Sequence, residues 1–178
     1  TTIDGMNLSE DGLDLSNWRN DMKKPMYKFG PENVDDIIKF VKEKKPLNPV
    51  FVDCTASYDL PDRYLDILNA GMSIATPNKR ANSKNIEFYH ELRRTANKMH
   101  RRFLYETNVG AGLPIIDTLQ NLYKSGDKLV SFNGIMSGSL SYIFGKLDEG
   151  VPFSKAVLEA KSLRYTEPDP RDDLNGMD

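Results

Sequence analysis

Apolar residues recur at helical spacing in the stretch that begins at Pro31. Val34, Ile37, Ile38 and Val41 share one face, acidic residues come early and lysines come late. This charge order suits the helix macrodipole, and the pattern therefore predicts an amphipathic helix. The segment before it, residues 1–30, is punctuated by polar residues and glycine and predicts a loop with one short helix.

Three short apolar runs follow and alternate with helical patterns. The runs Val50–Asp53, Met72–Thr76 and Arg102–Glu106 have the length and composition of buried parallel strands. Strands that alternate with helices predict an α/β fold with right-handed crossovers, in which ligands gather at the carboxyl ends of the strands. The loops that directly follow the three runs are therefore expected to carry a site.

Two helices are expected between these runs. One follows Asp59 and ends at Gly71, because a glycine suits the left-handed position after a helix. The other is capped by Asn82 or Ser83. Its inward face is expected to comprise Ile86, Tyr89, Leu92, Ala96 and Met99.

The remainder of the chain begins with a helix that Pro114 opens and Gly126 ends. A strand is expected over Lys128–Ile135, and two helices follow around Leu140–Leu147 and Phe153–Leu163. The change in pattern predicts a domain boundary near residue 112.

Charge and composition limit the kinds of binding partner and the cellular compartment that the chain suggests. The 24 basic and 26 acidic residues nearly cancel and are interspersed, so neither nucleic acid nor a membrane surface is expected as a partner. The one cysteine, Cys54, excludes a disulfide framework and favours a reducing compartment. Since no stretch approaches the roughly 18 apolar residues of a membrane span, a cytoplasmic location is expected.

Polar motifs follow two of the predicted strands. Thr76–Lys79 places an ammonium group where such a sheet binds ligands, although a surface lysine after a turn is the alternative. The hydroxyls of Thr55 and Ser57 suit a nicotinamide or a ribose. Cys54 would need a nearby base to act as a nucleophile, so a small buried residue is the favoured interpretation.

Two further motifs offer oxygen ligands or carboxylates. Glu106–Leu113 combines one carboxylate with carbonyls that two glycines free to turn, which suits a hard cation, or else a tight turn before a helix. The segment from Glu167 to Asp178 holds five carboxylates and two prolines that are expected to keep it out of a helix. Its density favours a cationic partner, with a solvated acidic loop as the alternative.

Taken in order, these motifs resemble those of homoserine dehydrogenases, above all the dehydrogenase part of bifunctional aspartokinase/homoserine dehydrogenases. The motifs are VDCT (52–55), TPNK (76–79), ETNVGAGLP (106–114), SGSLSYIF (137–144) and YTEPDPRDDLNGMD (165–178). The resemblance implies that residues 1–112 are the second part of a Rossmann-like NAD(P)-binding domain. It implies that residues 113–178 start a mixed α/β substrate-binding and dimerisation domain. No Gly-x-Gly-x-x-Gly fingerprint is present, so the first βαβ unit of such a domain is expected to be missing.

The resemblance also implies an activity: NAD- or NADP-dependent reduction of L-aspartate 4-semialdehyde to L-homoserine in threonine and methionine biosynthesis. Lys79 and Asp178 would be catalytic, and Glu167, Asp173 and Asp178 would bind substrate. Thr55, Ser57, Thr76, Lys79 and Arg164 would contact the cofactor. Glu106, with carbonyls of Val109, Ala111 and Leu113, would bind sodium. A homo-oligomer, with an aspartokinase domain in the same polypeptide, is expected.

Two departures from the family stand out. A proton-donating lysine of the family lies beyond the position of Asp178, so we expect these 178 residues alone to turn over no substrate. Arg164 stands where the family usually has a glycine beside the cofactor. Two alternatives remain: a catalytically dead module for dimerisation or regulation, and a phosphorylating semialdehyde dehydrogenase that works through Cys54.

Overall fold

The computed structural model describes residues 5–28, 33–134 and 136–176. The chain divides into two compact units, Thr1–Pro49 and Val50–Asp178.

The first unit contains a small antiparallel strand pair and two helices. Strand β1 (Gly5–Met6) pairs with β2 (Tyr27–Lys28), the short helix α1 (Trp18–Asp21) lies between them in the chain, and α2 (Asn33–Lys44) follows. The predicted short helix and amphipathic helix are confirmed, whereas the strand pair was not predicted. Glu10 forms an ion pair with Lys44, with 2.5 Å between Oε1 and Nζ.

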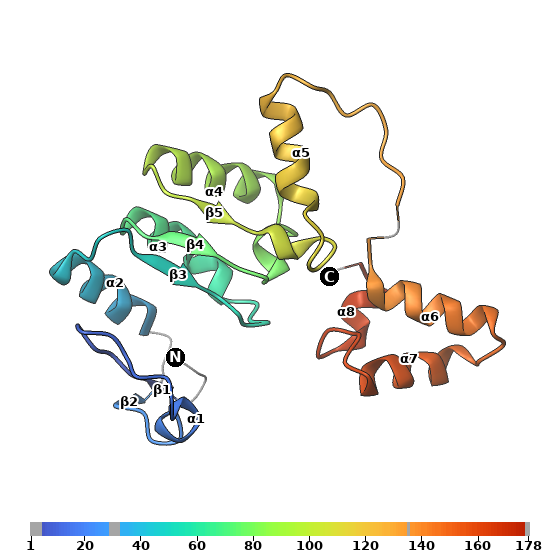
Figure 1. Cartoon of the computed structure of the whole chain (residues 1–178), viewed down its shortest axis with the longest axis horizontal. Helices are drawn as coiled ribbons and strands as arrows, with labels where there is room; N and C mark the ends of the chain where they lie inside the picture. The colour runs from blue at the N-terminus through green and yellow to red at the C-terminus, as the bar shows by residue number, and fades with distance from the viewer. Residues whose placement is uncertain (1–4, 29–32, 135, 177–178) are drawn as a thin grey trace. The chain divides into compact units, whose positions relative to one another are not determined.

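The second unit is built around a parallel sheet in the order β3-β4-β5 (Figure 1). The strands are β3 (Val50–Val52), β4 (Ser73–Ala75) and β5 (Phe103–Leu104), so all three predicted strands are present but shorter than expected. Ile74 of the central strand is fully buried. The parallel order places the loops after β3, β4 and β5 at one edge of the sheet.

Helices that connect the strands supply the core. They are the 3-10 turn η1 (Leu60–Arg63), α3 (Tyr64–Asn69), the 3-10 turn η2 (Lys79–Ala81) and α4 (Ile86–Lys98). Ile67 and Leu68 of α3 and Leu92 of α4 are fully buried, and α3 packs against both β4 and α4. Burial of such side chains contributes about 1.5–3 kcal/mol each to the stability of the fold.

The predicted start of α4 was wrong by a few residues. Asn85, rather than Asn82 or Ser83, caps the helix, and its side chain accepts the backbone N–H of Phe88 at 2.8 Å. Asn82 instead ends η2 and donates a side-chain hydrogen bond to Asn108. Because the helix starts later, Ile86 lies in its first turn and is 58% exposed rather than inward.

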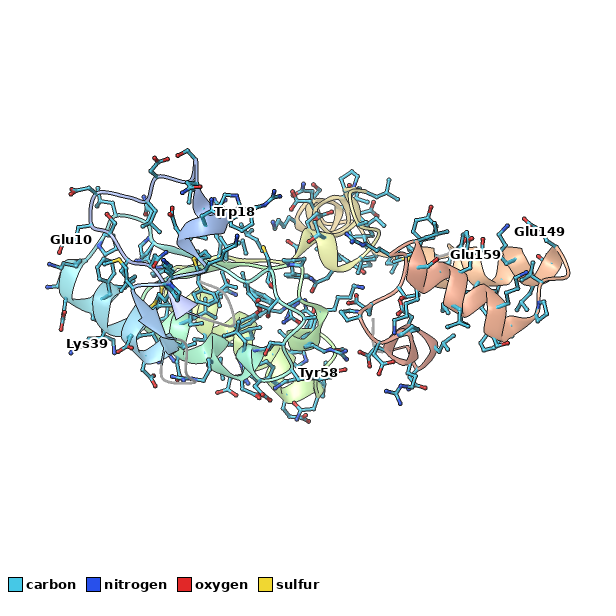
Figure 2. All side chains as sticks on the ribbon, turned by 90° about the horizontal axis from the view of Figure 1, so that it is seen from below. Glu10, Trp18, Lys39, Tyr58, Glu149 and Glu159 are labelled. Atoms are coloured by element: carbon cyan, nitrogen blue, oxygen red, sulfur yellow. The ribbon has the colours of Figure 1, made fainter. Side chains whose placement is uncertain are left out.

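The rest of the second unit is helical. Its helices are α5 (Ile115–Lys124), α6 (Gly138–Asp148), α7 (Phe153–Ser162) and α8 (Pro170–Leu174). Helices α6 and α7 form a hairpin around buried Ile143, Ala156 and Ala160. Glu149 lies at the turn of this hairpin and Glu159 on α7 (Figure 2), where it accepts the Tyr142 hydroxyl at 2.8 Å.

Two expectations for this region are corrected. Residues 128–134 form no strand, and Ile135 lies outside the described residues. Val130 is 97% exposed, because no strand in the described part of the chain lies beside this segment to pair with its backbone. The prolines do not keep the acidic segment out of a helix: Pro170 occupies the first position of α8, where its missing N–H costs nothing.

Helix α5 ends in a Schellman motif that depends on Gly126. This residue has φ +89°, and the neighbouring N–H of Asp127 reaches back to the carbonyl of Leu122 at 3.0 Å. We expect Gly126→Ala to lower the free energy of unfolding by about 1 kcal/mol, since a Cβ is strained there. Urea denaturation checks this. Gly145→Ala, inside α6 with open space around it, should raise stability, and equal effects of the two changes would contradict the assignment.

Candidate active site

A cavity of about 530 Å³ opens where the loops after β3 and β4 meet the acidic segment. The loop after β3 contributes Cys54, Thr55 and Tyr58, and the loop after β4 contributes Lys79 and Arg80. The acidic side is formed by Glu167, Asp169 and Asp172. The cavity therefore lies at the carboxyl edge of the sheet, where the sequence predicted a ligand.

Lys79 and Glu167 face each other in this cavity. The distance between Lys79 Nζ and Glu167 Oε1 is 2.7 Å, and each side chain is 30% exposed. Lys79 and Thr107 also line a second cavity of about 360 Å³, which the 108–111 and 136–139 segments complete. A cation thus stands between two adjoining cavities, with a carboxylate as its partner.

A buried polar network fixes the loop that carries Lys79. The carboxylate of Asp53, 1% exposed, accepts hydrogen bonds from the Tyr64 hydroxyl at 2.5 Å, the Asn78 side-chain amide at 3.2 Å and the Thr55 N–H at 2.7 Å. Thr76 donates its hydroxyl to the Asp53 carbonyl at 3.0 Å and accepts the Asn78 N–H at 2.9 Å. Asn78, directly before Lys79, is therefore held from two sides.

This network predicts a loss of stability in alkaline solution. Burial and the hydrogen bond to Asp53 raise the pKa of Tyr64 above its ordinary value near 10. The folded state then keeps a proton that the unfolded chain releases, so this contribution is complete below pH 10 and declines above it, by up to about 1.4 kcal/mol per pH unit. Urea denaturation at pH 9, 10 and 11 measures it. Tyr64→Phe should show a shallower decline, and an unchanged slope would exclude Tyr64 as the cause.

The acidic segment is held by its own carboxylates. Asp173, 1% exposed, accepts the Glu167 N–H at 2.8 Å and does not line the cavity. Asp169 caps α8 through the Arg171 N–H, and its side-chain and backbone hydrogen bonds with Arg171 hold the pKa of Asp169 at about 2. Asp178 lies outside the described residues.

Only some of the residues expected to contact the cofactor line the cavity. Thr55 and Lys79 line the cavity. Ser57 uses its hydroxyl to accept the N–H groups of Asp59 and Leu60, and Thr76 is buried in the network described above. Arg164 follows α7 with φ +60°, is exposed, and does not line the cavity.

The Glu106–Leu113 motif forms the 3-10 turn η3 (Glu106–Asn108) and the loop before α5. The two carboxylate oxygens of Glu106 accept the N–H groups of Ile116 at 3.1 Å and Asp117 at 2.7 Å. An anion there complements the N-terminal end of α5. The Leu113 carbonyl accepts the Ile115 N–H at 2.9 Å, and within the described residues no cluster of three His, Cys, Asp or Glu side chains suits a metal.

Comparison with known families decides what this arrangement belongs to. Residues 11–106 match the model of the homoserine dehydrogenase NAD-binding domain, and residues 114–178 match the model of homoserine dehydrogenase itself. The chain belongs to the homoserine dehydrogenase family. The parallel sheet and the NAD-binding match together indicate a Rossmann-like fold.

The relatives of this chain extend well beyond it. A bifunctional aspartokinase/homoserine dehydrogenase of Haemophilus influenzae is 48% identical over 97% of the chain, which spans 21% of that protein. A homoserine dehydrogenase of Schizosaccharomyces pombe is 38% identical over the whole chain, which spans 48% of it. A hyperthermophilic archaeal homoserine dehydrogenase in complex with NADPH is 32% identical, with TM-score 0.66 over 85% of the chain and 44% of that structure.

One expectation about the candidate site was wrong. Cys54 is exposed and lines the cavity, rather than being a small buried residue. Cys54 lies on the loop that follows β3, and its residue type did not predict that this loop position is exposed. Neither histidine lines the cavity, so no imidazole within its described lining can serve as a base for the thiol.

The sequence analysis missed two residues of the candidate site, Tyr58 and Arg80. Both line the cavity, and both contact Asp172 of α8. A signal for Arg80 existed, because it directly follows Lys79 in the same loop.

Among the described residues, no helix is both long enough and apolar enough to cross a membrane.

Proposed function

We propose that the intact protein is an NAD(P)-dependent homoserine dehydrogenase that interconverts L-aspartate 4-semialdehyde and L-homoserine. One observation carries the proposal: Lys79, from the NAD-binding match, pairs with Glu167, from the homoserine dehydrogenase match, at 2.7 Å in a shared cavity. The archaeal relative holds NADPH, which supports NADP or NAD as the cofactor.

The residues suit a zwitterionic substrate. Glu167 offers a carboxylate to the substrate ammonium, and Lys79 offers an ammonium to its carboxylate or to the oxygen of the reacting carbonyl. A bound nicotinamide supplies the hydride that reduces the aldehyde carbon, and a proton completes the alcohol. Thr55, beside Lys79 in the cavity, would hold the cofactor there. The proposal also includes cofactor contacts from Ser57, Thr76 and Arg164. It assigns substrate binding to Asp173 and Asp178, and a catalytic role to Asp178 as well.

The proposal extends to the organisation of the protein. We assign residues 1–112 to an NAD(P)-binding domain and residues 113–178 to a substrate-binding and dimerisation domain. Family matches that end at residue 106 and begin at residue 114 support this boundary. The bifunctional relatives support a fused aspartokinase. A cytoplasmic homo-oligomer with a role in threonine and methionine biosynthesis is also part of the proposal.

We further propose a sodium ion at Glu106, with carbonyl oxygens of Val109, Ala111 and Leu113. Each carboxylate oxygen of Glu106 accepts one N–H and keeps a lone pair for a hard cation, which supports the proposal. Sodium should raise the melting temperature of the protein more than potassium does, and this difference should vanish in Glu106→Gln.

The test of the main proposal is absorbance at 340 nm while the full-length protein is offered L-homoserine with NADP⁺ or NAD⁺. We expect reduction of the cofactor that depends on homoserine. A protein that binds cofactor yet reduces none would instead support the dimerisation or regulatory module. Oxidation of the semialdehyde that requires phosphate and is lost on thiol alkylation would instead support catalysis through Cys54.

A further inference from the structure

Beside the Lys79–Glu167 pair lies a second charged cluster. Arg80 Nη2 lies 2.6 Å from Asp172 Oδ2 and 2.6 Å from the Tyr58 hydroxyl, which donates to the same carboxylate oxygen at 2.7 Å. The Arg80 guanidinium carbon is 3.9 Å from the centre of the Tyr58 ring. Tyr58 lies on the loop that follows β3 (Figure 2).

The Arg80–Asp172 pair is less exposed than the other ion pairs of the described residues, although Tyr58 itself is 55% exposed. The side chains of Arg80 and Asp172 are 12% and 19% exposed, against 82% and 43% for the neighbouring Arg171–Asp169 pair. Nη1 of Arg80 is buried without a hydrogen-bond partner among the described residues, while the guanidinium as a whole stacks on the electron-rich face of the Tyr58 ring. A shielded, stacked pair of this kind holds its geometry better than an exposed one.

The cluster and the Lys79–Glu167 pair connect η2 to the acidic segment at two points. Lys79 pairs with the side chain of Glu167, while the Glu167 N–H is fixed by Asp173. Asp172, next to Asp173 on α8, is fixed by Arg80, next to Lys79 on η2. Two successive residues of η2 thus hold two ends of one acidic segment, so that movement of α8 displaces Glu167 from Lys79.

We infer that Arg80 and Asp172, stacked and bridged by Tyr58, are positioning residues that set Glu167 opposite Lys79 for substrate binding. The inference rests on the proposed function for the identity of the substrate. The positioning itself rests on the contacts above. Loss of the Arg80–Asp172 pair should therefore weaken homoserine binding far more than cofactor binding.

The experiment is a double-mutant cycle in the full-length protein with Arg80→Met and Asp172→Asn. Each single variant should raise the KM for L-homoserine about tenfold or more, with a smaller change in the KM for NADP⁺, and the double variant should be no worse than either single one. Arg80→Lys, which keeps the charge but loses the stack, should recover part of the loss. Arg171→Ala, on the same helix, is the matched control and should leave the KM unchanged.

Hydrogen exchange of a peptide over residues 164–176 separates the two proposals. Arg80→Met should speed exchange of the Glu167 amide, whereas Arg171→Ala should not, whatever substrate the protein uses. If the unaltered protein fails to oxidise homoserine but this exchange difference appears, the proposed function fails and the positioning stands. Additive effects in the cycle, or equal exchange in the two variants, would overturn the inference.

Discussion

Replacement of Lys79 by alanine in the full-length protein should lower kcat/KM for L-homoserine by about 100- to 1000-fold. The reason is that Lys79 is the cation that faces Glu167 in the cavity and borders both cavities. Removal of a single preorganised donor to a developing oxyanion commonly has an effect of this size. The measurement is cofactor reduction at 340 nm, with cofactor binding followed separately by fluorescence.

Lys84→Ala is the matched control for this prediction. Lys84 lies in the same segment, pairs with Asp62 and lines neither cavity, so its loss should leave kcat/KM within about twofold. Glu167→Gln should act chiefly on the KM for homoserine. An active Lys79→Ala protein that thiol alkylation inactivates would instead favour the mechanism through Cys54, although alkylation there can also hinder a neighbouring cofactor.

A substrate that binds in the cavity must break the ion pair between Lys79 and Glu167. In the described structure Lys79 and Glu167 neutralise each other across 2.7 Å. A zwitterion that binds between them replaces this ion pair with two new ones, its ammonium with Glu167 and its carboxylate with Lys79. Each protein charge therefore keeps a partner of opposite charge when the substrate binds. A substrate analogue without the ammonium group should therefore bind poorly, because it leaves Glu167 without a partner in a half-buried place.

Local patterns predicted the elements whose contacts are local or strongly periodic. Helix α2 and the three strands of the sheet follow from apolar spacing, and the sheet order then placed Lys79 at the ligand edge. The resemblance to a family, rather than spacing, joined Lys79 to Glu167. Tertiary folding brings them together although 88 positions separate them.

The wrong and missing predictions concern residues whose environment depends on parts of the chain that are distant in sequence. Residues 128–134 have strand-like composition but no neighbouring strand among the described residues. The burial expected for Cys54 followed from its residue type, whereas its position in the loop after β3 leaves it exposed. The cluster of Tyr58, Arg80 and Asp172 joins the loop after β3, the turn η2 and helix α8, and no spacing along the chain encodes these contacts.

Asp53 offers the sharpest test of how this edge of the sheet is held. Its buried carboxylate accepts from Tyr64, Asn78 and Thr55, which lie on three different segments. Asp53→Ala leaves these donors without their acceptor in a site that water does not reach, and should lower the free energy of unfolding by about 3–4 kcal/mol. Urea denaturation at pH 7 measures the loss.

Graded variants show whether the charge or the shape of Asp53 matters. Asp53→Asn keeps one acceptor oxygen and should lose about half as much stability as Asp53→Ala, while Tyr64→Phe removes one donor and should lose about 1–2 kcal/mol. Asp66→Ala, on exposed α3 surface beside Arg63, should change stability by no more than about 0.5 kcal/mol. If Asp53→Ala matched Asp66→Ala, the network would not be what holds the loop. Lys79 would then owe its position to the pair with Glu167 alone, and both variants of that pair should lose binding and loop order together.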